Sequence, residues 1–279
     1  MDGRKRGAAL VSGGAIPWAQ GAAAAAPAMP LASMTFGLPF LGAGLGGAGR
    51  RRGGGAPFAS VGASCCSKAV PKLFAAPLTE PATGIAYPDT LCVATKSHCP
   101  GLAGVGVRAK RILGLKNINV YALGLYVDAS GAKKALGKWK GSSGDALLKS
   151  QAAFDALVNT ESFERSLRLV ISFGGLKRAT FVNALEERLA PPLRKAGKSA
   201  VMQDFERLFD NASFKKGTEI DFSASGHGKL VTKVDGKQVG TIESPELVKA
   251  LFDIYLGSDA VSADAKASFA QGLSALLRE

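Results

Sequence analysis

The stretch GVGVRAKRILGLKNINVYALGLYV, residues 104–127, decides the fold of this chain. Apolar, β-branched and aromatic residues recur at every second position on both sides of Gly114-Leu115. This period of two predicts a pair of β-strands joined by a short turn at these two residues. The strands are expected at 103–113 and 116–128, as an antiparallel hairpin.

The register of this hairpin follows from the length of its turn. A two-residue loop that begins with Gly pairs Leu113 with Lys116 and places Arg108 directly opposite Tyr121. Directly opposed side chains lie on one face of the sheet, with their Cβ atoms roughly 5 Å apart. A four-residue loop would place Arg108 and Tyr121 diagonally, still on the same face.

The environment of Arg108 raises a chemical question. Strand 116–128 carries apolar residues on both faces, which implies that both faces of the hairpin are covered. Arginine in a strand is commonly solvated, but a buried guanidinium must be paired. No acidic residue lies within several positions of Arg108 on the hairpin. Its partner is therefore either a distant Asp or Glu or a bound anion, and a guanidinium beside a phenol suits a carboxylate.

Beyond the hairpin, strand patterns and helix patterns form separate runs along the chain. This segregation predicts an α+β fold with a large, mainly antiparallel sheet. Asp145 is expected to cap the first long helix, and Pro191-Pro192 to kink or break the next one. The expected strands are 84–94, 163–172 and three within 217–242, and the expected helices are 143–159, 175–197, 199–211, 244–257 and 262–277.

The first 74 residues differ in composition from the rest and are excluded from the fold. They hold 8 of the 35 Lys and Arg residues but only one acid, Asp2, and 32 of them are Ala or Gly. Such a segment cannot bury enough large apolar side chains to offset the entropy of ordering. An acid-poor, arginine-bearing leader is typical of an organellar transit peptide, and a disordered tail without a targeting role is the alternative. The folded domain is expected at 75–279.

The charge and hydropathy of the chain argue against nucleic-acid binding and against a membrane span. Much of the net charge of +13 belongs to the leader, so it gives little support for nucleic-acid binding. The basic run 133–140 is interpreted as a solvated face, because Trp139 is the one aromatic residue among its lysines. No run of about 18 strongly apolar residues is present, so no membrane span is expected.

The cysteines and histidines do not form a recognisable reactive site. Cys92, His98 and Cys99 offer three potential ligands, but their spacing fits no zinc motif, and surface or loop thiols are favoured over a metal site. His227 lies between two glycines and is interpreted as an exposed turn residue. No Ser-His-Asp or paired-carboxylate arrangement is found. We therefore expect neither a metal nor a cofactor.

Several segments together resemble a known family. RAKRILGLKNINVYALGLYV, FERSLRLVI, LFDNASFKKGTEIDFSASGHGKLVTKVDGK and IESPELVKALFDIYLG are similar to the chalcone isomerase superfamily, over about residues 78–278. The resemblance implies an open-faced β-sandwich, in which a large antiparallel sheet is covered by a layer of helices with a cleft between them. The superfamily contains isomerases, which close chalcones to flavanones, and non-enzymatic plastid fatty-acid-binding proteins.

The positions that identify a true isomerase depart from its pattern. The enzymes carry an Arg and a Thr on the hairpin, then a Tyr, a Lys and an Asn along the following helix. Alignment through FERSLRL puts Tyr121 at the Thr position. The three helix positions fall on Thr180, Asn183 and Glu187. These departures imply that the chain is not an enzyme of this type.

The Arg and Tyr pair resembles the fatty-acid-binding branch, in which these two residues hold the carboxylate. The resemblance implies that Arg108 and Tyr121 bind the head group of a free fatty acid, with Leu123, Thr180 and Phe181 as further ligand contacts. We expect a monomeric, non-catalytic carrier or buffer of fatty acids in the chloroplast stroma. Two alternatives stay open. One is a chalcone-isomerase-type cyclase in which Arg108 steadies a phenolate and Tyr121 polarises a ketone, and the other is a regulatory ligand-binding module.

Overall fold

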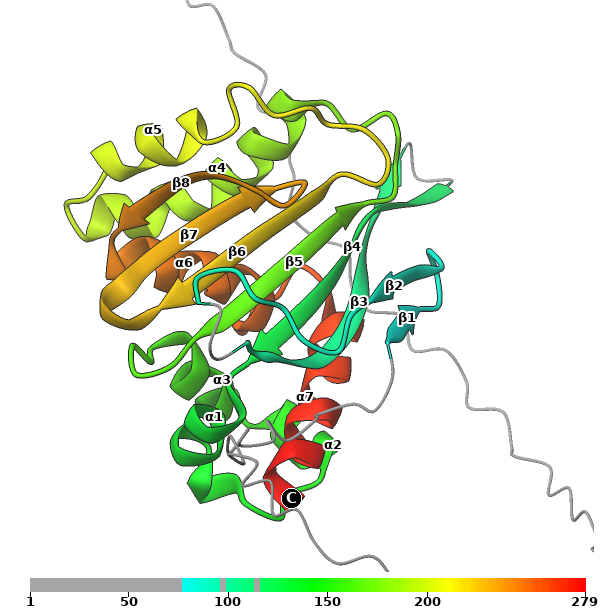
Figure 1. Cartoon of the computed structure of the whole chain (residues 1–279), viewed down its shortest axis with the longest axis vertical. Coiled ribbons are helices and arrows are strands. Elements are labelled where there is room, and N and C mark those ends of the chain that lie inside the picture. The colour runs from blue at the N-terminus through cyan, green and yellow to red at the C-terminus, as the bar shows by residue number, and fades with distance from the viewer. Residues whose placement is uncertain (1–76, 96–98, 113–115) are drawn as a thin grey trace, which may run out of the picture. The chain divides into compact units, whose positions relative to one another are not determined.

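The computed structural model describes residues 77–95, 99–112 and 116–279, so the predicted leader and the predicted turn at Gly114-Leu115 lie outside the described residues. A six-stranded antiparallel sheet with its strands in chain order, β3 to β8, forms the centre (Figure 1). The predicted α+β class is confirmed. The strands are β3 (Gly101–Ile112), β4 (Lys116–Val127), β5 (Arg165–Ile171), β6 (Glu219–Ser225), β7 (Lys229–Val234) and β8 (Lys237–Glu243).

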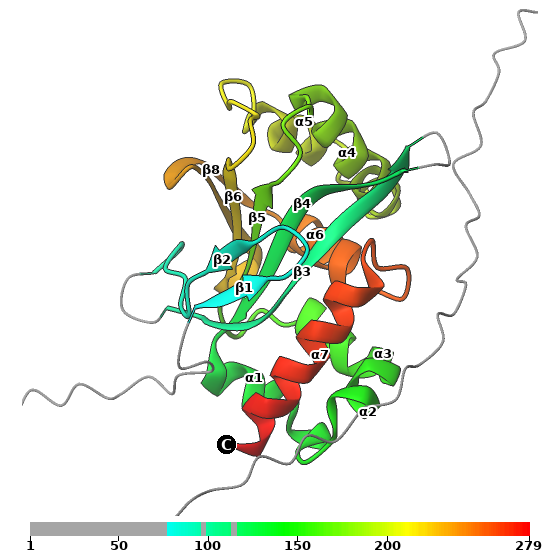
Figure 2. The ribbon, with the colours of Figure 1, turned by 90° about the vertical axis from the view of Figure 1, so that its right-hand side faces the viewer.

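Helices cover one face of this sheet, and a small hairpin lies on the other (Figures 1 and 2). Within the described chain, no helix combines the length and the apolar character that crossing a bilayer requires. The helices on the first face are α4 (Arg178–Lys195), α5 (Ala200–Arg207), α6 (Pro245–Leu256) and α7 (Ala263–Arg278). The hairpin consists of β1 (Leu78–Glu80) and β2 (Ile85–Tyr87), and α1 (Ala129–Ala135), α2 (Gly144–Lys149) and α3 (Gln151–Val158) lie at one end of the sheet.

The predicted strand at 84–94 is shorter than expected. It ends at Tyr87, directly before Pro88. Proline has no N–H to donate to a neighbouring strand, so the ladder stops there.

Each face of the sheet carries its own apolar cluster. On β4, Leu123 and Leu125 belong to the main core between the sheet and the helices. Ala122 and Tyr126 belong to a smaller cluster on the β1–β2 side. The β3–β4 hairpin is therefore covered on both faces, as the apolar pattern of β4 predicts.

The pairing of β3 with β4 confirms the predicted partner of Arg108. Arg108 lies opposite Tyr121. Next to the turn, however, Ile112 rather than Leu113 lies opposite Lys116. The register at the turn is therefore shifted by one residue from the prediction, although the pair at Arg108 is the one expected.

A β-bulge at Val120 reconciles these two registers. Ala109 pairs with Asn119, whereas its neighbour Arg108 pairs with Tyr121, so Val120 is the extra residue on β4. A bulge of this kind re-aims the side chains beyond it. Here it sets the face on which Tyr121 meets Arg108.

The long helix α4 runs without interruption through Pro191 and Pro192, so the predicted break there is wrong. Each proline removes one helical N–H donor. The carbonyl groups that lose these donors belong to Glu187 and Arg188, and both residues are exposed. Water can replace the lost bonds, and the helix continues.

Serine hydroxyls cap three helices. At the start of α2, Ser143 accepts a hydrogen bond from the N–H of Ala146, and the predicted cap Asp145 lies inside the first turn instead. A capping residue must precede the first helical residue, so Asp145 comes too late in the chain. Ser244 and Ser262 cap α6 and α7, and they are the first residues of the helices predicted over 244–257 and 262–277.

Ser262 also joins α7 to β3, next to Arg108. Its hydroxyl accepts from the N–H of Ala265 (3.2 Å) and donates to the carbonyl of Val107 (2.7 Å). Ser262→Ala should lower the free energy of unfolding by about 1 kcal/mol, because it removes a helix cap. Urea unfolding measures this loss, with Ser258→Ala as the matched control, expected within about 0.5 kcal/mol of the parent protein. An equal loss in both variants would contradict the role of the cap.

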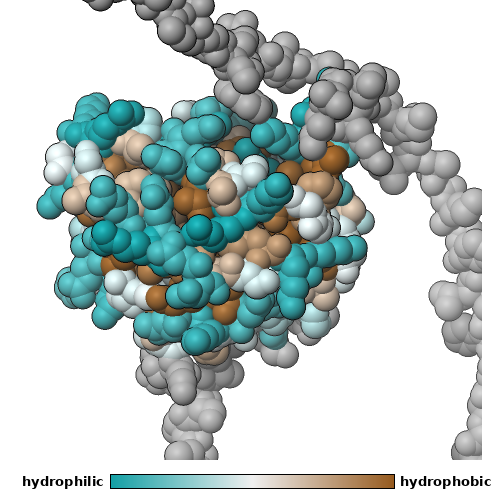
Figure 3. Space-filling model, turned by 90° about the horizontal axis from the view of Figure 1, so that it is seen from above, coloured by the Kyte–Doolittle hydropathy of each residue, from teal (hydrophilic) through white to brown (hydrophobic). Residues whose placement is uncertain are grey.

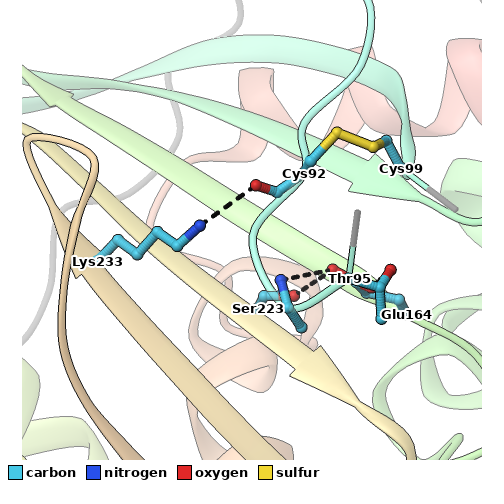
Figure 4. Close-up of a disulfide and its surroundings, with 7 residues drawn as sticks. Cys92, Thr95, Cys99, Glu164, Ser223 and Lys233 are labelled. Atoms are coloured by element: carbon cyan, nitrogen blue, oxygen red, sulfur yellow. Dashed lines mark hydrogen bonds between the residues drawn. A yellow bond between two sulfur atoms is a disulfide. The ribbon is translucent and has the colours of Figure 1, made fainter. Parts of the chain in front are cut away.

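A disulfide joins Cys92 to Cys99 on the β1–β2 side of the sheet (Figure 4). The interpretation of these residues as surface or loop thiols is therefore wrong. The chain reverses here, since the N–H of Leu91 donates to the carbonyl of Pro100 (3.0 Å), and this brings the two Cα atoms to 4.6 Å. Spacing along the sequence does not reveal such a reversal.

Polar contacts anchor the first part of this disulfide-closed segment to the sheet. Glu164, which directly precedes β5, accepts hydrogen bonds from the hydroxyls of Thr95 (2.9 Å) and Ser223 (2.7 Å). Lys233 on β7 donates to the carbonyl of Cys92 (3.3 Å). The segment thus covers the smaller apolar cluster and leaves the opposite, helix-facing side of the sheet to the candidate site (Figure 4).

Candidate functional site

Arg108 lies on the helix-facing side of β3, where α7 begins. The residues before it on this face, Gly104 and Gly106, allow α7 to approach closely, because a Cβ at Gly106 would overlap Ala265. The hydroxyl of Ser262, the cap of α7, donates to the carbonyl of Val107, so α7 begins beside the residue that precedes Arg108. The helix therefore covers the glycines, and Arg108 itself is half-buried.

Two buried phenols lie on the same face. The phenol oxygens of Tyr121 on β4 and Tyr255 on α6 are 3.2 Å apart and share a hydrogen bond. Their side chains are 5% and 1% exposed. Two phenols have two O–H protons and use one in this bond. The other O–H can donate to a third group.

Electrostatics tie Arg108 to both phenols. Burial raises the pKa of the Tyr121 phenol, and the charge of Arg108 is the strongest effect opposing that rise. Burial also raises the pKa of Tyr255 well above its ordinary value, and the neighbouring Tyr121 phenol raises it further. The charge of Arg108 acts in the opposite direction and lowers this pKa. Both phenols are therefore protonated donors at neutral pH. We call Arg108, Tyr121 and Tyr255 the polar cluster.

Within the described part of the chain, the positive charge of the polar cluster has no carboxylate counter-ion. Arg108 forms no salt bridge with any of the residues that the structure describes. Arg168 on the opposite face, by contrast, binds Asp221 through two contacts of 2.7 and 2.9 Å. A guanidinium beside a phenol O–H presents donors that match the two oxygens of a carboxylate. The cluster is thus suited to an anion that the described residues do not supply.

Apolar side chains surround the polar cluster. Phe181 on α4 packs edge-on against Tyr121, with ring centres 6.2 Å apart. Phe209 and Phe214 pack against Phe181 at 5.8 and 5.2 Å. Leu123 is fully buried and belongs to the same core cluster as Tyr121. Hydrocarbon surface beside two phenols and a cation suits an amphiphile with an anionic head.

The structure brings together four of the five residues predicted to contact a ligand. Arg108, Tyr121, Leu123 and Phe181 lie on the helix-facing side of the hairpin or against it. Thr180 precedes Phe181 on α4 and is exposed. Contact of each of these five residues with a ligand stays a prediction.

Sequence reasoning missed Tyr255. This residue lies 134 positions from Tyr121 along the chain, and only the packing of α6 on the sheet brings the two phenols together. The signal that could have found it is a single phenol on an otherwise apolar helix face, with Leu251 one turn earlier. That signal identifies a buried tyrosine but not its partner.

Two other features of the described chain lie apart from the polar cluster. A groove of about 690 Å³ between α4 and α5 is lined by several charged groups, including Glu186, Glu187, Arg194 and Glu206. His227 is exposed in the turn between β6 and β7, as predicted. Among the described residues, no group of three or more His, Cys, Asp or Glu side chains is placed to hold a metal ion.

Comparison with known proteins agrees with this architecture. The chalcone-flavanone isomerase family matches residues 83–276. Fatty-acid-binding protein 1 of Arabidopsis thaliana is 29% identical over 204 residues, which are 71% of this chain and 71% of that protein. Fatty-acid-binding protein 2 of the same plant is 34% identical over 196 residues, covering 67% of this chain and 48% of that protein.

Similarity extends to an enzyme and to a solved structure. A chalcone–flavanone isomerase of Oryza sativa subsp. japonica is 30% identical over 209 residues, 70% of this chain and 88% of that protein. The crystal structure of an Arabidopsis thaliana fatty-acid binding protein matches with a TM-score of 0.62 and 29% identity, covering 72% of this chain and 98% of that one. The matched region contains the whole six-stranded sheet and the polar cluster. The chain belongs to the chalcone-flavanone isomerase family.

Proposed function

We propose that this protein binds free fatty acids without catalysing a reaction, and that Arg108 and Tyr121 hold the carboxylate. One observation carries the proposal: a half-buried guanidinium faces two buried phenols and has no carboxylate partner within the described structure. A fatty-acid head group would supply the missing anion. The names of two similar plant proteins, both fatty-acid-binding proteins, support the same ligand class.

The acyl tail would contact the apolar side chains around the polar cluster. Leu123 and Phe181 lie next to Tyr121 in the main core. Burying each CH₂ group of the tail contributes about 0.8 kcal/mol before the costs of association. The affinity should therefore rise with chain length, while the carboxylate fixes the orientation of the ligand.

Matched ligands test this proposal most simply. Dodecanoic acid and dodecanol have the same hydrocarbon tail but differ in charge. We expect the acid to bind more tightly by roughly 10-fold or more, because only the acid offers an anion to Arg108. Calorimetric titration of the full chain measures both affinities. Equal affinities would show that the head group is not recognised and would overturn the proposal.

Support for a non-catalytic protein comes from α4. Thr180, Asn183 and Glu187 occupy the positions that correspond to the helix residues of the isomerases, and all three side chains are exposed. Phe181, which has no proton to transfer, is the α4 residue that faces Tyr121. Incubation with a chalcone should therefore give no turnover above the spontaneous rate. Clear turnover would favour the isomerase alternative.

The phenols should contribute less to binding than Arg108 does. Tyr121→Phe removes one uncharged donor and should weaken fatty-acid binding by about 0.5–1.5 kcal/mol, roughly 2- to 12-fold. Tyr255→Phe should weaken it by roughly twofold, because Tyr255 acts through its hydrogen bond with Tyr121. Fluorescence titration with a fatty-acid probe measures both effects.

Tyr126→Phe is the matched control for these two variants. Tyr126 is a buried tyrosine on the opposite face of β4, and its hydroxyl donates to the carbonyl of Pro88 (3.1 Å). Its loss should leave the affinity unchanged. If Tyr126→Phe weakened binding as much as Tyr121→Phe, the effect would be general to the fold and not specific to the polar cluster.

We place this function in the chloroplast stroma. The acid-poor, arginine-bearing leader of residues 1–74 supports import into a plastid. Processing should remove the chain before about residue 60–76, as expected for a transit peptide. N-terminal sequencing of protein from isolated plastids tests this directly. An intact leader on the mature protein would argue against the location.

A further inference from the structure

One end of the sheet carries an exposed aromatic side chain. Among the described residues, Phe173 is the one large apolar side chain classed as exposed, at 36%. It lies two residues after the end of β5, and its N–H donates to the carbonyl of Val120 (3.2 Å) at the bulge of β4. Phe173 therefore lies at the same end of the sheet as the Arg108–Tyr121 pair. Figure 3 looks down on this end, where hydrophobic surface lies between hydrophilic side chains.

Basic side chains lie at the same end of the sheet as Phe173. The loop after β5 approaches the loop before β6, since a Cβ at Gly174 would lie 3.8 Å from that of Lys216. Four exposed cations on this end form no salt bridge with the residues described here. We call these four cations and Phe173 the docking end; its cations are Arg111 on β3, Lys177 before α4, and Lys215 and Lys216 before β6.

Two acidic groups near this end are already paired with arginines, and a third, Asp235, accepts a hydrogen bond from the N–H of Glu219 (2.9 Å). Asp210 binds Arg178 at 2.9 Å, and Glu219 binds Arg168 at 3.2 Å. The four cations of the docking end are therefore not neutralised by these neighbours. An anionic partner would find four positive charges around one exposed ring.

A lipid bilayer fits this combination better than a folded protein does. A protein interface needs a contiguous apolar core, and one exposed ring among long cationic side chains is too small for that. A bilayer with anionic head groups offers negative charge across its whole surface and a hydrocarbon layer that accepts a single ring. Long lysine side chains can reach the head groups while Phe173 enters the interface.

We propose that the docking end binds the surface of an anionic lipid bilayer, with Phe173 inserted and Arg111, Lys177, Lys215 and Lys216 on the head groups. The polar cluster lies close to this surface, because ring contacts run from Tyr121 to Phe181 and on to Phe214, which directly precedes Lys215. A fatty acid in the polar cluster would thus be near the bilayer. The docking itself needs no bound fatty acid, so it is independent of the proposed function.

Vesicle sedimentation of the full chain tests the proposal. Wild-type protein should bind vesicles that contain phosphatidylglycerol and phosphatidylcholine, with a partition coefficient that falls as salt increases. The variant Lys177→Gln/Lys215→Gln/Lys216→Gln should bind about 100-fold more weakly, because each lysine contributes about a factor of five. Phe173→Ser should bind about tenfold more weakly, since it loses the apolar anchor.

A second triple variant serves as the matched control, because it shows whether vesicle binding depends on the docking end or only on the total positive charge. Lys134→Gln/Lys138→Gln/Lys140→Gln removes the same charge from exposed lysines at and after α1, and leaves the leader unchanged. It should bind anionic vesicles within about twofold of wild type, since its lysines lie far from the surface contacted. Equal losses in the two triple variants would overturn the proposal, and so would binding of wild type to pure phosphatidylcholine as strong as to the anionic vesicles. An acidic soluble protein that binds the docking end while vesicles do not would overturn it as well.

Fatty-acid affinity, measured without vesicles, distinguishes this proposal from the proposed function. The docking-end triple variant should bind dodecanoic acid as wild type does, because its three lysines are not in the polar cluster. Loss of vesicle binding with unchanged fatty-acid affinity supports the docking surface. Loss of vesicle binding together with loss of fatty-acid affinity would show that the substitutions damage the fold. The three lysines would then not form a separate docking surface.

Discussion

Arg108→Ala should weaken fatty-acid binding by about 1.5–3 kcal/mol, or roughly 10- to 150-fold, while the empty protein keeps its stability. The loss of affinity follows from removing the charged donor of the polar cluster. The unchanged stability follows because Arg108 has no salt-bridge partner among the described residues, so no carboxylate is left unpaired. Fatty-acid titrations and thermal melts on the same preparation measure both quantities.

The opposite pattern would assign Arg108 a structural role. Removing one partner of a buried ion pair typically costs about 3–5 kcal/mol, because the other charge remains without compensation. A collapsed melting temperature with unchanged fatty-acid affinity would therefore show that Arg108 supports the fold. Arg168→Ala is the matched control with the reverse expectation, because Arg168 binds the buried carboxylate of Asp221.

Alkaline pH should unfold the protein steeply, because all four of its tyrosines are buried. Burial raises the pKa of Tyr87, Tyr121, Tyr126 and Tyr255 above the ordinary value. In the unfolded chain the phenols ionise near pH 10. The stabilisation from the four protonated phenols is therefore complete below about pH 10 and is lost as the pH rises toward the raised values.

The slope of this loss can be estimated. Each tyrosine contributes roughly 1.4 kcal/mol per pH unit once its unfolded phenol is ionised. Burial acts in the opposite sense on two cations, because it lowers the pKa of Arg165 to about 10 and also lowers that of Lys266. These groups favour the folded state as the pH rises, and the net loss becomes roughly 3–4 kcal/mol per pH unit above pH 10.5.

Tyrosinate absorbance, followed together with circular dichroism, measures this transition. We expect no tyrosinate signal while the protein is folded, and then all four phenols should ionise together with the loss of structure. Gradual ionisation near pH 10 with intact circular dichroism would contradict the burial of the phenols. Tyr87→Phe should lower the net slope by about 1.4 kcal/mol per pH unit, roughly two fifths of it, since it removes one of the four tyrosine contributions.

Local patterns in the sequence predict much of this fold. The period of two in the hairpin and its apolar residues on both faces predict β3, β4 and their cover. Ser244 and Ser262 predict the starts of α6 and α7, because a serine hydroxyl satisfies an N–H that the helix leaves unpaired. The pair Asp235-Gly236 is typical of a two-residue hairpin turn, and it forms the turn between β7 and β8 with positive φ at both residues. These features depend on neighbours in the sequence, so the sequence is enough to find them.

Features that depend on tertiary contacts could not be predicted in this way. The disulfide between Cys92 and Cys99 needs the chain reversal that pairs Leu91 with Pro100. The continuity of α4 through its prolines depends on which carbonyl groups face water. The bulge at Val120 restored the Arg108–Tyr121 pair although the register at the turn was wrong.

The residues of the candidate site also fall into those that the sequence could place and those that depend on tertiary packing. Arg108 and Tyr121 could be paired from the register of one hairpin. Phe181 was placed near them by a family resemblance, and the structure brings it to 6.2 Å from Tyr121. Tyr255 could not be assigned, because its phenol reaches Tyr121 only when α6 packs on the sheet. A site built from several elements is visible in the sequence only where one element contributes two of its residues.

The central claim is that Arg108 holds the carboxylate of a bound fatty acid, and carbon-13 NMR of dodecanoic acid labelled at its carboxyl carbon tests it most directly. A carboxylate beside a guanidinium keeps its charge to lower pH. The bound acid should therefore titrate about one to two pH units lower in wild type than in Arg108→Ala, which corresponds to the 1.5–3 kcal/mol expected from binding. Equal titration midpoints in the two proteins would contradict the claim.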